Sequence, residues 1–149
     1  MNYCTTQHLI DAHGETELIQ LTDRTGLGVI DNGIVNAALD KADSLINQRL
    51  RTKGWTLPLT DSVILSSADL KNLAVDITRY YLHGHLPEIP KQVQADFDLV
   101  LKTLADYVKG VLTLDIGEPP SAVNTGSGAG DVDFSAPERV FTEESLRGF

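Results

Sequence analysis

Hydrophobic residues recur every three or four positions in three long stretches of the chain, residues 35–50, 70–81 and 93–108. This spacing places the apolar side chains along one face of an α-helix. Two shorter stretches, around Leu9 and Leu18, show part of the same pattern. Each apolar stripe needs a partner surface, and the three long helices can cover one another. We therefore expect an all-α fold, a small helical bundle.

Helix-capping residues, prolines and glycines bound these stretches. The segment Trp55–Leu59 forms an extended connector between two of them, because Pro58 disfavours helix in the residue before it. Elsewhere, residues that cap a helix N-terminus come before an apolar stripe, and glycines follow its end. We expect N-caps at Thr5 or Thr6, at Asn32 and at Ser66 or Ser67, Pro90 in the first turn of the last helix, and helix ends at Gly14, Gly54 and Gly110.

The pattern changes after residue 110. Residues 111–114 are predicted to form a short β segment, and residues 117–131 are rich in Gly, Ser, Pro, Asn and Thr without an apolar period, as is typical of a linker. Apolar residues return near the C-terminus, where residues 139–142 favour an extended conformation. We divide the chain into a helical body (1–114), a flexible linker (115–138) and an extended C-terminal arm (139–149).

The C-terminal arm needs a surface outside itself. Its eleven residues cannot bury an apolar set alone, because ordering each residue costs about 1–2 kcal/mol. The 24-residue linker spans at most about 80 Å at ~3.3 Å per residue, which is enough to reach a neighbouring subunit. We expect the arm to bind a partner through Arg139, Val140, Phe141, Leu146, Arg147 and Phe149.

Charge and composition narrow the class of protein. The net charge is −9, and residues 111–149 contribute −5 of it through seven acidic and two basic residues. This acidity argues against tight nucleic-acid binding, although an acidic surface can line a passage through which DNA slides. No apolar run approaches the roughly 18 residues of a membrane span, and no signal sequence begins the chain. Cys4, the single cysteine, excludes an internal disulfide and fits a reducing cytoplasm.

Residues 23–34 have the outline of a calcium-binding loop. Asp23 stands at its first position and Gly28 at its sixth, but Ile34 stands where a bidentate Glu is required, and Thr25 and Leu27 replace two oxygen ligands. We favour a tight interhelical loop in which glycines adopt positive φ angles. A degenerate calcium-binding module remains the alternative.

Candidate catalytic residues lie on the predicted helix that begins near residue 68. Asp76 and Arg79 are three residues apart and can pair along its surface. We favour a structural or intersubunit ion pair, and the alternative is a buried catalytic carboxylate with a charged partner. A small hydrolase that uses Asp76 and His83 is the alternative enzyme hypothesis. His83 and His85 flank Gly84 and can share a metal, but no nearby cysteine supplies a third ligand. Because motifs of nucleophilic catalysis and phosphate binding are missing, we expect no catalytic residue, cofactor or metal.

A basic cluster closes the predicted helix that follows Asn32. Arg49, Arg51 and Lys53 stand in its last two turns, where cations favour the helix dipole. We favour this structural interpretation. The alternative is a small contact with an acidic partner or with DNA.

Four segments together resemble one known family. They are Leu21–Arg24 (LTDR), Trp55–Leu59 (WTLPL), Leu73–Tyr80 (LAVDITRY) and Arg139–Phe149 (RVFTEESLRGF). In this order they resemble the Mu-like phage and prophage family of small head–tail neck proteins, long known only as a domain of unknown function. The terminal segment is the most specific of the four. Members often carry further acidic residues where Thr25 and Leu27 stand here.

The resemblance implies a non-enzymatic virion protein, a head–tail connector or adaptor. Such a subunit forms a homo-oligomeric ring, commonly dodecameric, below the portal protein. The ring extends the DNA channel toward the tail, contacts portal and downstream neck or tail proteins, and meets DNA only as passing cargo. The resemblance also implies a location at the head–tail interface of the virion, and in the host cytoplasm during assembly.

Overall fold

The computed structural model describes residues 2–60 and 62–120, and the regular structure in these ranges is helical. The expected all-α fold is confirmed. The sequence pattern did not predict the single-turn helix at Ser62–Leu65, because four residues are too few to show an apolar period. The helices are α1 (Thr6–His13), α2 (Glu15–Thr22), α3 (Asn32–Lys53), α4 (Ser62–Leu65), α5 (Ala68–His83) and α6 (Lys91–Val108).

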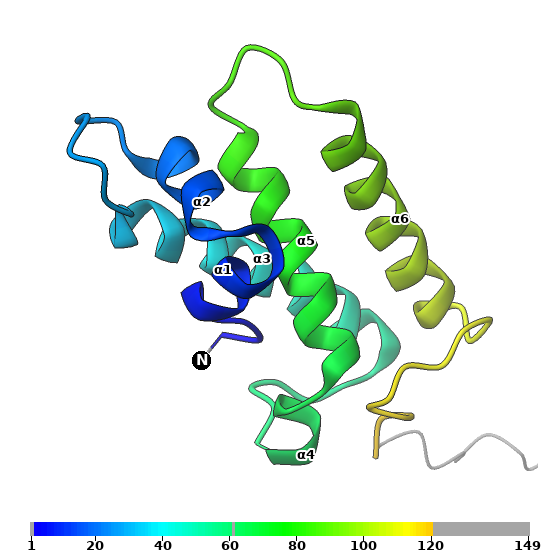
Figure 1. Cartoon of the computed structure of the whole chain (residues 1–149). Coiled ribbons are helices and arrows are strands. Elements are labelled where there is room, and N and C mark those ends of the chain that lie inside the picture. The colour runs from blue at the N-terminus through cyan, green and yellow to red at the C-terminus, as the bar shows by residue number, and fades with distance from the viewer. Residues whose placement is uncertain (1, 61, 121–149) are drawn as a thin grey trace, which may run out of the picture.

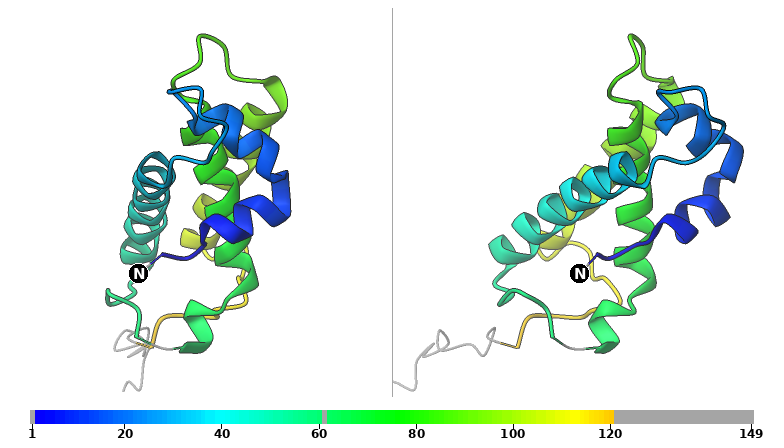
Figure 2. Two further views of the ribbon diagram at one scale, coloured as in Figure 1. Left: turned by 60° about the vertical axis from the view of Figure 1, so that its left-hand side comes forward. Right: turned by 90° about the vertical axis from the view of Figure 1, so that its left-hand side faces the viewer.

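Helix α5 lies at the centre of the bundle. It contacts α3 and α6, and it also contacts the two short helices α1 and α2. Figure 1 shows α6 on one side of α5 and α1 and α2 on the other, and Figure 2 shows α3 crossing α5. The contacts of α5 explain why Leu70, Ala74 and Ile77 are almost completely buried.

Most helix ends agree with the sequence. Thr5 forms a capping box with His8 at the start of α1, and the Ser67 hydroxyl accepts from the Leu70 N–H at the start of α5. Gly54 ends α3 in the left-handed region, at a φ of 111°. The expected N-cap at Asn32 is wrong by one residue. The cap is Asp31, whose carboxylate accepts from the N–H groups of the second and third helical residues and also carries the charge that a helix N-terminus favours.

The short β segment expected at residues 111–114 does not form. The backbone N–H groups of Val111 and Leu112 both donate to the carbonyl oxygen of Asp106, so their hydrogen bonds stay local. Leu114 and Ile116 are buried against the helices. Their alternation with exposed residues suggests a strand, but the segment lies on a helical surface and has no partner strand within the described residues. The other β segment, at 139–142, lies outside the described residues.

The N-terminal residues pack against α3. Tyr3 and Cys4 are buried, and the Tyr3 N–H donates to Asp43 Oδ1 at 3.2 Å. Burial of the Asp43 carboxylate raises its pKa from 3.8 to about 6, an effect that the Tyr3 hydrogen bond reduces. A buried carboxylate is costly when ionised, because it loses its hydration. Asp43 therefore holds the N-terminal residues in place, but its burial lowers the stability of the fold more as the pH rises and the carboxyl group ionises.

We expect the substitution Asp43→Asn to stabilise the protein at neutral pH. The folded protein binds the Asp43 proton more tightly than the unfolded chain does, so stability is lost as pH rises from about 4 to about 6. Asn keeps an oxygen acceptor for Tyr3 and carries no charge. Urea unfolding should give a gain of about 1–3 kcal/mol at pH 7.5 and little change at pH 4. The exposed substitution Glu88→Gln is the control, and an equal response of both variants would contradict the prediction.

Candidate functional site

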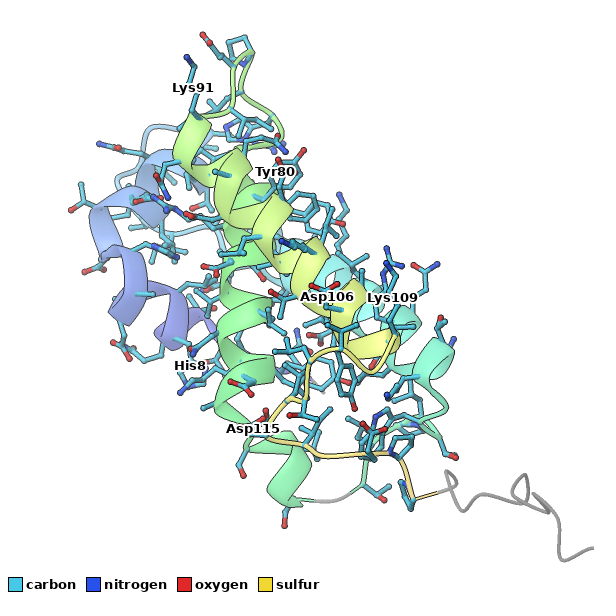
Figure 3. The ribbon with its side chains drawn as sticks, turned by 90° about the vertical axis from the view of Figure 1, so that its right-hand side faces the viewer. His8, Tyr80, Lys91, Asp106, Lys109 and Asp115 are labelled. Carbon is cyan, nitrogen blue, oxygen red and sulfur yellow. The ribbon has the colours of Figure 1, made fainter. Side chains whose placement is uncertain are left out.

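The chain that follows α6 folds back across one end of the bundle. Residues 111–120 run from the end of α6 past the N-terminus of α5 toward the end of α3, as Figures 1 and 3 show. Leu114 and Ile116 anchor this stretch in the core. Six polar contacts, described next, fix it further. We call residues 114–119 the anchor segment, because they determine where the C-terminal part of the chain leaves the body.

Asp115 caps helix α5 from a distance of 46 residues along the chain. Its carboxylate accepts from the Ser67 hydroxyl and from the backbone N–H groups of Ala68 and Asp69, at 2.9 and 3.3 Å. The Asp115 N–H donates in return to Asp69 Oδ2 at 2.8 Å. Desolvation works against these bonds, but the bonds prevail and lower the pKa of Asp115. The anchor segment and the start of α5 thus satisfy each other's polar groups.

Tyr107 joins the anchor segment to the core. Its hydroxyl accepts from Trp55 Nε1 at 2.8 Å and donates to the Gly117 carbonyl oxygen at 2.9 Å. The ring of Tyr107 is completely buried. Burial also raises the pKa of this hydroxyl, which keeps the proton that the bond to Gly117 requires. Tyr107 of α6 therefore connects the anchor segment to Trp55, which follows the end of α3.

Lys53 adds an ionic contact. Its ammonium lies 3.0 Å from Glu118 Oε2 and 5.2 Å from the centre of the Tyr107 ring. Glu118 and Asp115 belong to the region that sequence analysis assigned to the linker. These first residues of the linker contact the helical body.

The predicted binding residues of the C-terminal arm, Arg139, Val140, Phe141, Leu146, Arg147 and Phe149, lie outside the described residues. Their role stays a prediction. The described part of the chain supplies the point from which the arm departs. That point, Pro120, follows directly on the anchor segment.

The loop between α2 and α3 is held by a single carboxylate. Asp23 Oδ1 accepts from the N–H groups of Thr25, Gly26 and Leu27, and Oδ2 accepts from Gly28 at 2.6 Å. The bond from Gly28, with the other three, lowers the pKa of Asp23. Gly26 and Gly28 adopt φ angles of 74° and 71°, as expected for a tight loop. A calcium ion bound at Asp23 would have to displace these N–H groups.

This loop also exposes two aliphatic side chains, Leu27 and Val29, which are 74% and 57% accessible. Single exposed aliphatic side chains are common on protein surfaces, so this exposure by itself does not identify a binding site. Sequence analysis missed this feature because the calcium-loop comparison treats Leu27 only as a missing ligand.

Arg79 forms its salt bridges with residues other than Asp76, although its charge opposes the rise in the pKa of Asp76. Arg79 Nε and Nη2 donate to Oε1 and Oε2 of Glu17 in α2, at 2.7 and 3.2 Å. Arg79 Nη1 also lies 3.9 Å from Oδ2 of Asp96 in α6. A planar guanidinium can donate two parallel hydrogen bonds to the two oxygens of a carboxylate that faces it. This contact is stronger than a contact with a neighbour on the same helix. Arg79 therefore links α5 to α2 and α6. Burial raises the pKa of Asp76, and the charge of Asp96 raises it further.

The structure does not bring Asp76 and His83 together. They are seven residues apart on α5, which is about 10 Å along the helix axis. The imidazole of His83 is buried, and its Nδ1 lies 2.9 Å from the carbonyl oxygen of Arg79. His85 is exposed, and its Nδ1 lies 2.7 Å from the carbonyl oxygen of Leu82. Both histidines thus bond to the last turns of α5.

The remaining candidates have structural surroundings. Lys53 of the basic cluster belongs to the anchor contacts, whereas Arg51 is exposed and Arg49 is half-buried. Cys4 is buried beside Thr78, and burial raises the pKa of its thiol to about 11. That pKa disfavours the reactive thiolate.

Within residues 2–60 and 62–120, no group of three or more His, Cys, Asp or Glu side chains lies close enough together to bind a metal ion. The helices described there include none with the length and apolar character to span a membrane.

The chain matches a known protein family. A family model described as bacteriophage Mu, Gp36 matches residues 3–132. The match covers the helical body, the anchor segment and the beginning of the chain beyond it. None of the curated proteins matches the chain.

We expect the substitution Asp115→Ala to destabilise the protein and loosen the anchor segment. Loss of a helix-capping side chain costs about 1 kcal/mol, here for α5. Urea unfolding should show this loss, and limited proteolysis should cut residues 111–120 sooner than in the parent chain. The control is Asp106→Ala in α6, where the carboxylate forms no hydrogen bond within the described residues. Equal stability and equal cleavage in the two variants would refute the anchoring role.

Proposed function

Because the chain belongs to the bacteriophage Mu Gp36 family, we propose that it is a virion structural protein, a head–tail connector subunit. The family match covers most of the chain and makes it a Mu-like phage protein. The more specific role rests on the resemblance of the terminal segment Arg139–Phe149 to phage neck proteins and on the way the chain leaves the body.

In this proposal the subunits form a closed ring below the portal protein. The ring, commonly of twelve subunits, extends the DNA channel toward the tail and contacts downstream neck or tail proteins. The protein would reside at the head–tail interface of the virion and, before assembly, in the host cytoplasm. The role needs no catalytic step, cofactor or metal.

The anchor segment is the observation that supports this proposal most directly. Asp115, Tyr107 and Lys53 attach it to three helices, so the chain departs from a fixed place on the body. A fixed point of departure limits the volume that the arm explores. A ring then repeats each weak arm contact around its axis, and the repeated contacts add up to a stable assembly.

The charge of the chain suits the same role. Residues 111–149 have a net charge of −5, which favours solubility of free subunits before assembly. Acidic surfaces also bind DNA weakly, and a channel through which DNA passes must not retain it. DNA would therefore be cargo and not a bound ligand.

We expect deletion of residues 139–149 to leave a folded helical monomer that no longer enters the phage neck. Circular dichroism should show unchanged helix content, and electron microscopy of lysates from a phage carrying the deletion should show heads without tails. The substitutions Phe141→Ala, Leu146→Ala and Phe149→Ala together should reproduce the defect.

Thr142→Ala is the matched control, because it alters the arm without removing an apolar anchor. Normal neck assembly by the deletion variant would overturn the connector proposal. A stable large ring formed by purified protein without portal would instead show that assembly needs no template.

A further inference from the structure

A groove runs along helix α3 on the face that also meets the end of α5. It consists of two adjoining hollows of about 590 and 520 Å³ that share Lys41 and Tyr81. Volumes in this range are typical of sites that bind ligands or side chains. We call the pair the α3 groove. Its walls come from α3 between Gly33 and Gln48, from the end of α5 with the two residues after it, and from Arg24 in the 23–31 loop.

The lining of the α3 groove includes both apolar and basic residues. Ile34, Ala37 and Tyr81 contribute apolar surface. Arg24 and Lys41 contribute positive charge, and within the described ranges neither forms an ion pair, although Lys41 lies 5.9 Å from the centre of the Tyr81 ring. Asp40 is the acidic residue among the described lining, and it accepts from Asn2 at 3.4 Å. Such a groove fits a segment with apolar side chains on either side of acidic ones.

The C-terminal arm has this composition. Glu143 and Glu144 stand between Phe141 and Leu146. Residues 131–149 as a whole carry five acidic and two basic residues. The charges of the arm and the groove are therefore complementary, and both contain an apolar set. Complementary charge of this kind favours one register of binding over others.

The length of the connection suits binding within a single chain. Pro119 lies beside Gly54 at the end of α3, and Lys41 is thirteen residues earlier, which is about 20 Å along the helix axis. A random coil with the length and Gly/Ser-rich composition of residues 121–138 would have a root-mean-square span of about 23 Å. A linker whose span matches the distance gives an effective concentration in the millimolar range, well above that of free subunits in solution.

We propose that the C-terminal arm of the free subunit binds in the α3 groove of its own chain. Glu143 and Glu144 meet Lys41 and Arg24, and Phe141 packs toward Tyr81. This inference deepens the proposed function and rests on it, since the arm must leave the groove to engage the neighbouring subunit or the portal. The groove thereby covers apolar side chains until assembly and competes with the assembled partner for the arm.

Zero-length cross-linking of the full chain tests the contact. A carbodiimide joins an amine to a carboxylate that touches it. An equal mixture of ¹⁴N- and ¹⁵N-labelled protein at low micromolar concentration distinguishes links within a chain from links between chains. We expect mass spectrometry to find Lys41 joined to Glu143 or Glu144 in isotopically unmixed pairs. Mixed pairs would place the arm in a second copy and overturn the proposal.

Charge reversal gives a second, independent measurement. Chymotrypsin cleavage after Phe141 reports how often the arm leaves the groove. We expect Lys41→Glu to speed this cleavage about fivefold, as the loss of one or two exposed ion pairs predicts. The added substitutions Glu143→Lys and Glu144→Lys should restore the parent rate. Lys102→Glu, an exposed position on α6, is the matched control.

These results separate the two proposals. Cleavage that is insensitive to Lys41→Glu, together with the absence of a link to Lys41, would overturn binding in the groove and leave the connector role standing. The opposite result is also distinct. If Lys41 protects the arm from cleavage but a phage assembles its neck without this protein, the connector role is overturned and binding in the groove stands.

Discussion

The burial of the apolar side chains of helix α5 determines how the other helices are arranged. This helix is apolar around most of its circumference and lies among α1, α2, α3 and α6, so its burial brings every other long element into place. Burial also leaves polar groups that need partners. Asp115 meets them at the N-terminus, and Arg79 meets Glu17 and Asp96 beside the middle of the bundle. These polar contacts decide the arrangement of the segments around α5, which hydrophobic contact alone leaves loosely defined.

The sequence predicts the helices well because helix formation is largely local. The apolar period and capping residues placed α1, α3, α5 and α6 to within a residue or two. The sequence does not reveal contacts between distant segments. Asp115 caps α5 across 46 residues, and Arg79 selects Glu17 across 62 residues, so neither pair leaves a signal at a fixed spacing. The short strand predicted at 111–114 was wrong for the same reason, since only the fold shows that the chain packs there on a helical surface.

The candidate site, like the fold, could be predicted from the sequence only where its features are local. Composition indicated where a linker begins, and the contacts of Glu118 and Asp115 show that its first residues belong to the body's surface. The two aliphatic residues of the 23–31 loop were visible in the sequence, but their exposure was not, because exposure depends on which face the loop turns to solvent. The α3 groove was likewise hidden, since its walls come from three separate segments.

The anchor segment has a mechanical consequence. It is attached near its ends and its middle to α3 through Lys53, to α5 through Ser67 and to α6 through Tyr107. A pulling force that enters through the C-terminal part of the chain is therefore shared among three helices before it can unwind any one of them. Such load sharing would suit the proposed connector role, in which a subunit has to stay joined to its neighbours while a DNA-filled head is under pressure.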